Sequence, residues 1–145
     1  MIRKLVTSTR KTALPGDHPA LAENGAAPAR ILVIEDDADV AESLCLLLES
    51  YGYETLRAVD GVAAFDRLKQ GKLPDLILLD LMLPRMNGWE FRQAQLADTR
   101  LREVPVLVLS AVGELAEPIE ADQLLRKPFS PEKLIETIEL YRRRT

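Results

Sequence analysis

Acidic residues end two short apolar runs of the sequence. They are Glu35, Asp36 and Asp37 after Ile31–Ile34, and Asp80 after Leu76–Leu79. If the two runs are neighbouring strands, their acids meet, and clustered carboxylates repel one another unless a cation lies between them. Hard oxygen ligands suit Mg²⁺, so the pattern predicts a magnesium site whose metal would also bind the oxygens of a phosphoryl group.

A hydroxyl and an ammonium group follow later runs of the same kind. Ser110 ends the fourth apolar run, and Lys127 stands directly before Pro128. Asp80 would be the nucleophile that forms an aspartyl-phosphate, with the metal and Lys127 offsetting charge on the transferring group. Ser110 would donate a hydrogen bond to the phosphoryl oxygens, and a cis bond before Pro128 would be one way to aim the lysine. Any one of these residues could instead be a helix cap or turn former, so the prediction depends on the whole set.

The elements that must position these residues alternate between strand and helix. Predicted strands cover 31–34, 54–58, 76–79, 104–109 and 124–125, and predicted helices cover 40–51, 60–71, 89–97 and 130–141. Several strands are apolar throughout, as in a sheet covered on both faces. We therefore expect an α/β fold with a doubly wound, mostly parallel sheet, which binds ligands at the carboxyl ends of its strands. In the first helix, the spacing places Val40, Leu44 and Leu48 on the inner face.

Composition and charge exclude several other classes of protein. The 145 residues are 47% hydrophobic and 29% charged, which fits one globular domain, and a net charge of −4 provides no general basic field for nucleic acid. Cys45 is the single cysteine, which fits a reducing cytoplasm and excludes a Cys-rich metal site. No apolar run approaches the roughly 20 residues of a membrane span. We expect a soluble cytoplasmic protein that binds neither nucleic acid nor membrane.

Residues 1–29 differ from the rest of the chain. Ala, Pro and Gly dominate from Ala13 onward, and such a segment cannot bury enough apolar surface to offset the entropy of ordering it. His18 lies there and is assigned no role. We predict a flexible N-terminal tail over 1–29 and a folded domain over 30–145.

Four motifs in order resemble the receiver domain of two-component response regulators. They are Ile31–Asp37, Leu79–Gly88, Ser110-Ala111 and Lys127-Pro128-Phe129. The resemblance runs from about residue 30 to residue 141, nearly everything outside the tail. It implies a flavodoxin-like, five-stranded parallel sheet with strand order 2-1-3-4-5.

The resemblance also implies a metal-ligand set. Asp36, Asp80 and the backbone carbonyl of Met82 would bind Mg²⁺ directly, and Glu35 would act through a metal-bound water. Asp37 lies one position beyond the acidic pair and is not counted as a ligand.

For phosphoryl transfer, the resemblance implies that Asp80 is the phospho-acceptor, Ser110 the switch hydroxyl and Lys127 the phosphoryl-binding cation. The donor would be a histidine kinase or a histidine phosphotransfer protein, and the receiver would pass its state to a downstream protein target. Such a phosphoprotein is not an enzyme acting on other substrates, because it catalyses only its own phosphorylation and dephosphorylation.

The sequence departs from the family in one segment and at the position of the switch aromatic. Ser110 and Lys127 are 17 positions apart, fewer than usual, and the segment between them carries Gly113 and Pro118. We therefore predict that the family's fourth helix is short or missing, which leaves a monomer or weak dimer. Leu124 replaces the switch aromatic, and apolar Met82 and Val112 predict slow loss of the phosphoryl group.

The leading hypothesis is a stand-alone phosphoacceptor switch. Only one helix follows Pro131, so no DNA-binding output is expected. The alternative is a receiver-like interaction scaffold with little or no phosphorylation. A phosphatase of the haloacid dehalogenase type is a poor fit, because Met82 stands where those enzymes need a second aspartate.

Overall fold

The computed structural model describes residues 29–111 and 121–144. Strands and helices alternate there as the sequence predicts, except that β5 is the next described element after β4. The elements are β1 (Arg30–Ile34), α1 (Ala38–Ser50), β2 (Glu54–Ala58), α2 (Gly61–Leu68), β3 (Leu76–Asp80), α3 (Gly88–Leu96), β4 (Val106–Ser110), β5 (Gln123–Arg126) and α4 (Pro131–Arg144). The predicted tail lies outside the described residues except for Ala29. The segment predicted to carry a shortened helix, 112–120, lies outside them as well.

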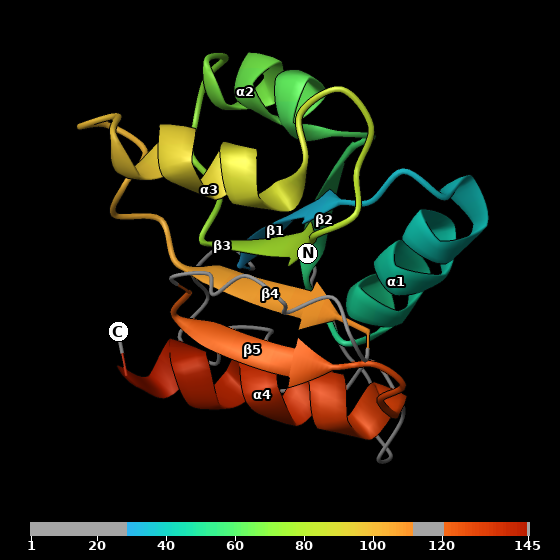
Figure 1. The fold of residues 1–145 in the computed structure, drawn as a ribbon. Coiled ribbons are helices and arrows are strands. Elements are labelled where there is room, and N and C mark those ends of the chain that lie inside the picture. The colour runs from blue at the N-terminus through green and yellow to red at the C-terminus, as the bar shows by residue number, and fades with distance from the viewer. Residues whose placement is uncertain (1–28, 112–120, 145) are drawn as a thin grey trace.

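The five strands form one parallel sheet in the order β2-β1-β3-β4-β5, which confirms the predicted fold (Figure 1). Ile34 pairs with Leu79 across β1 and β3, and Asp80 pairs with Leu109 across β3 and β4. Ser110, the last residue of β4, pairs with Arg126 of β5. The carboxyl ends of these four strands therefore lie along one edge of the sheet.

Helices cover both faces of the sheet, and alternate strand residues point into two separate cores. Helices α1 and α4 lie on one face, and α2 and α3 lie on the other (Figure 1). The first core contains Ile31, Val33, Leu44, Leu48, Leu78, Leu107, Leu134 and Ile138. The second contains Leu32, Ile34, Ala64, Leu68, Ile77, Leu79, Phe91 and Val108. Burial on both faces explains why β1, β3 and β4 are apolar almost throughout.

Side-chain caps fix where the helices begin. Asp37 caps α1, and Asp60 caps α2 by accepting from the amide of Ala63. Asn87 forms a capping box with Glu90 at the start of α3. Ser130 Oγ accepts from the backbone N–H of Lys133 at the start of α4. Each cap fixes the residue at which a helix begins after the chain has left the carboxyl edge of the sheet.

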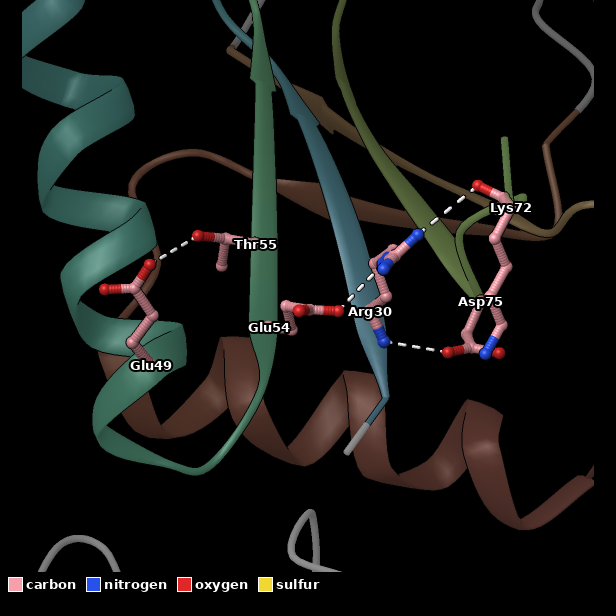
Figure 2. A network of polar contacts seen from close by, with 6 residues as sticks. All are labelled: Arg30, Glu49, Glu54, Thr55, Lys72 and Asp75. Atoms are coloured by element: carbon pink, nitrogen blue, oxygen red, sulfur yellow. Dashed lines mark hydrogen bonds and ion pairs between the residues drawn. The ribbon is translucent and has the colours of Figure 1, made fainter. Parts of the chain in front are cut away.

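Arg30 ties together the opposite, amino end of the sheet (Figure 2). Its backbone N–H donates to Asp75 at 2.7 Å, and its guanidinium donates to Glu54 at 2.8 Å and to the carbonyl of Lys72 at 3.4 Å. These contacts join β1 to β2 and to the segment that enters β3. The register of the central strands is thus held at the end remote from the clustered acids.

Some details differ from the sequence prediction, among them the end of α2, which lies at Leu68 and not at Gly71. The fourth strand begins at Val106 and not at 104, because Pro105 lacks the N–H that a ladder needs. Val40 is 41% exposed instead of facing the core, because it lies in the first turn of α1, beside a surface groove that Phe129 also lines. Among the residues described, no helix has the length and apolar character to cross a membrane.

Candidate metal and phosphoryl site

The carboxyl edge of the sheet brings together the five side chains that the sequence singled out. Glu35 and Asp36 directly follow β1, and Asp80 is the last residue of β3. Ser110 is the last residue of β4, and Lys127 directly follows β5. Four strands, adjacent in the sheet, therefore build one site from residues almost 100 positions apart.

The three carboxylates at this edge form a tight cluster. One oxygen each from Glu35, Asp36 and Asp80 lie within 4.8 Å of one another. Glu35 and Asp80 are buried, whereas Asp36 is exposed, so the cluster opens to solvent on one side. Buried carboxylates beside an open side suit a hard cation such as Mg²⁺, which keeps several of its waters.

Glu35 is the acid whose environment is least suited to a bare negative charge. Burial raises the pKa of Glu35 to about 7; the backbone N–H of Asp37 opposes this, and the charge of Asp80 adds to it. Its Oε2 accepts from that N–H at 3.1 Å, but its buried Oε1 has no hydrogen-bond partner among the described residues. An oxygen in this state fits a cation, or a water bound to one, as its missing partner.

Asp37 belongs to the helix and not to the cluster. Its Oδ1 accepts from the backbone N–H of Asp39 at 2.9 Å and of Val40 at 3.1 Å. The N-cap therefore occupies this carboxylate.

Lys127 places a positive charge beside Asp80. Its Nζ lies 3.3 Å from Asp80 Oδ1, and its backbone N–H donates to the carbonyl of Ser110 at 2.6 Å. The bond between Lys127 and Pro128 is cis. The ammonium thus lies where it can interact with a group attached to the Asp80 carboxylate.

Ser110 carries a completely buried hydroxyl that has no partner in the described part of the chain. Its side chain has 0% exposure, and no hydrogen bond to Oγ is present among the described residues. Buried hydroxyls are normally paired, so an unpaired one at a strand end marks a donor available to a group that arrives later.

The loop after Asp80 closes tightly on itself. The carbonyl of Leu81 accepts from the amides of Leu83 at 3.2 Å and of Gly88 at 2.9 Å. A Cβ atom at Gly88 would lie 2.7 Å from Leu81 Cα, so only glycine fits this approach. Met82, whose carbonyl is a predicted ligand, lies within this closed loop with its side chain 58% exposed.

Sequence reasoning missed one charged contact at this loop. Arg85 Nε donates to Asp60 Oδ2 at 2.5 Å, which joins the loop to the start of α2. The sequence indicates Asp60 only as the residue at which the predicted helix over 60–71 begins. The sequence carries no signal that pairs Arg85 with Asp60, because the positive φ of Arg85 is seen only in the structure.

Two further positions that the sequence links to the phosphorylated state are Leu124 and Val112. Leu124, in edge strand β5, is 37% exposed. Val112 is not among the described residues.

Comparisons with known proteins agree with this geometry. The family model for the response regulator receiver domain matches residues 31–139. The DNA-binding dual master transcriptional regulator RpaA of Synechocystis is 38% identical over 121 residues, which are 80% of this chain and 50% of RpaA. The chain thus spans about half the length of such curated relatives.

Two solved structures are similar in fold as well as sequence. A putative response regulator from Chloroflexus aurantiacus aligns with a TM-score of 0.71 and 32% identity over 77% of this chain and 95% of its own. The receiver domain of the sensor histidine kinase PA1611 from Pseudomonas aeruginosa, which holds a magnesium ion in its active site cleft, aligns with a TM-score of 0.70 and 25% identity, covering 77% of this chain and 94% of its own. The chain belongs to the response regulator receiver domain family.

Proposed function

We propose that this protein is a phosphoacceptor switch of a two-component or phosphorelay system, with Asp80 as the residue that is phosphorylated. The observation that carries the proposal is the pairing of Lys127 Nζ with Asp80 Oδ1 at 3.3 Å, next to the carboxylates of Glu35 and Asp36. A nucleophilic carboxylate, an ammonium and a candidate metal cluster meet at one point. Ser110 adds a hydroxyl that has no partner within residues 29–111 and 121–144.

The transfer step follows from these positions. An oxygen of the Asp80 carboxylate attacks the phosphorus of a phosphohistidine, so that a P–O bond forms and the P–N bond breaks. The electron pair of the P–N bond goes to the ring nitrogen, and a ring protonated on its other nitrogen leaves as neutral imidazole. Lys127 stabilises negative charge on the phosphoryl oxygens, and Ser110 donates a hydrogen bond to one of them once they are in place.

Asp36, Asp80 and the backbone carbonyl of Met82 would hold Mg²⁺, with Glu35 acting through a bound water. When bound, Mg²⁺ supplies positive charge that offsets the charge of the incoming phosphoryl oxygens. The orphaned buried Oε1 of Glu35 supports this assignment, and so does the magnesium ion in the similar PA1611 receiver. In this proposal the protein catalyses only its own phosphorylation and dephosphorylation.

The partners in this proposal are a histidine kinase or histidine phosphotransfer protein as donor and a downstream protein as target. The chain itself is proposed to bind no nucleic acid and to act as a monomer or weak dimer, although relatives such as RpaA are named as DNA-binding regulators. A mobility-shift assay checks this, and sequence-specific DNA binding by the chain would contradict it. A cytoplasmic location fits the single cysteine, Cys45, which is buried and free.

Trapping of the acyl phosphate tests the proposal and separates it from the scaffold alternative. The protein is incubated with Mg²⁺ and a histidine-phosphorylated phosphotransfer domain, reduced with borohydride and digested. The proposal predicts reduction of an acyl phosphate at residue 80, dependent on Mg²⁺ and absent in Asp80→Asn. An unmodified residue 80 with a panel of such donors and with acetyl phosphate would favour the scaffold.

A further inference from the structure

The loop that carries the candidate Mg²⁺ ligand Met82 is held against the start of α2 by contacts outside the phosphorylation site. Arg85 Nε donates to Asp60 Oδ2 at 2.5 Å, and the amide of Gly61 donates to the carbonyl of Met86 at 3.1 Å. The Met86 side chain fills the space where a Cβ of Gly61 would lie, 2.6 Å from Met86 Sδ. One ion pair, one backbone hydrogen bond and one packing contact thus join two consecutive residues of each segment.

The backbone at Arg85 indicates that the ion pair constrains this loop. Arg85 has φ 59°, and it is the one non-glycine with positive φ in the described parts of the chain. An arginine is strained in this region, which glycine and asparagine adopt more readily, and such strain persists where surrounding contacts over-determine the conformation. The contact with Asp60 supplies that constraint, because it holds the Arg85 guanidinium at 2.5 Å from Asp60 Oδ2.

Asp60 is suited to anchor such a contact. Its side chain is 2% exposed, whereas that of Arg85 is 59% exposed. Asp60 Oδ1 is already fixed by the amide of Ala63 at the start of α2, so its second oxygen is presented to the loop at a set position. A buried carboxylate held at the start of a helix can therefore orient the more exposed arginine side chain.

We propose that Asp60 and Arg85 form a clamp that positions the loop 81–87 for Mg²⁺ binding, with Arg85 acting as a positioning residue. Neither side chain belongs to the carboxylate cluster, and the clamp acts through the backbone between Asp80 and Met86. The inference rests on the proposed function for the identity of the metal. Residues behind the ligands of a metal commonly set its affinity by holding those ligands in place.

The test compares Arg85→Gln and Asp60→Asn with the wild type by amide NMR. Asparagine still caps α2 with its side-chain oxygen but lacks the charge that binds Arg85. Arg102→Gln is the matched control, because Arg102 is another half-exposed arginine, whose ion pair with Glu103 is long, at 4.0 Å. Mg²⁺ titrations give the dissociation constant, and amide exchange of Gly61 in Mg²⁺-free protein reports whether the loop is pinned.

We expect both clamp variants to weaken Mg²⁺ binding about tenfold and to speed exchange of the Gly61 amide, while Arg102→Gln does neither. The phosphorylation rate at saturating Mg²⁺ should stay within about twofold of wild type, because no reacting group is altered. Mg²⁺ binding and Gly61 exchange equal to wild type in Arg85→Gln and Asp60→Asn would overturn the clamp. Failure of the proposed function gives a different result, in which the wild type itself binds no Mg²⁺ or accepts no phosphoryl group.

Discussion

Replacing Ser110 with alanine should stabilise the protein before phosphorylation. The Ser110 hydroxyl is fully buried and has no hydrogen-bond partner among the described residues. A buried polar group left unsatisfied costs about 1–3 kcal/mol, and the loss of one oxygen removes only a few packing contacts. We therefore expect Ser110→Ala to raise the free energy of unfolding by about 1 kcal/mol and Tm by roughly 3 °C.

Urea and thermal unfolding of wild type and Ser110→Ala, without phosphodonor, measure this effect. Ser130→Ala is the opposite-sign control, because Ser130 Oγ caps α4 through the amide of Lys133 at 3.0 Å and its loss should cost about 1 kcal/mol. After phosphorylation the sign should reverse for residue 110, since wild type gains a hydrogen bond to a charged group that alanine cannot make. If Ser110→Ala is instead less stable than wild type by about 1 kcal/mol, the reasoning is refuted, because the hydroxyl must then have a stabilising partner.

Three further predictions follow from the same contacts. Burial raises the pKa of the Asp60 carboxyl, but hydrogen bonds from Arg85 and from a backbone amide outweigh burial and lower the pKa below 3.8. The stability lost in Asp60→Asn at neutral pH should therefore shrink as the pH falls below 3.8, which urea unfolding at several pH values measures. A difference in stability that does not change with pH would argue against this. Gly88→Ala should lower the free energy of unfolding by more than about 2 kcal/mol, because the new Cβ would lie 2.7 Å from the backbone of Leu81. Gly71→Ala should cost only about 1 kcal/mol, because Gly71 has φ 72° but a Cβ there would meet nothing within 4 Å. Equal losses in urea unfolding would contradict this. Because apolar Met82 cannot position an attacking water, phosphorylated protein should persist after the donor is removed, and loss of the phosphoryl group within seconds, followed by intact mass, would count against it.

The sheet and its site could be predicted because their signals are local and strong. An apolar run that ends in Asp80 or Ser110 indicates both a strand and the polar side chain that lies at its carboxyl end. Helix caps such as Asp60 and Ser130 are also legible, since a short polar side chain before an apolar period is a local feature. Parallel topology then brings residues far apart in sequence to the same edge.

The details that escaped prediction depend on the fold as a whole. The contact between Arg85 and Asp60 joins residues 25 positions apart, and the spacing of residue types in the sequence does not predict an arginine with positive φ. Val40 follows the helical pattern of the core residues but lies in the first turn of α1, where it stays 41% exposed. The raised pKa of Glu35 likewise arises mainly from burial, which a sequence shows only indirectly.

Intact mass after incubation with Mg²⁺ and acetyl phosphate tests the central claim most directly. The account predicts one added phosphoryl group on wild type, and none on Asp80→Asn or when Mg²⁺ is chelated. Addition that persists in Asp80→Asn, or that ignores chelation, would contradict the account, because the carboxylates of Glu35, Asp36 and Asp80 would then not be the site of the chemistry.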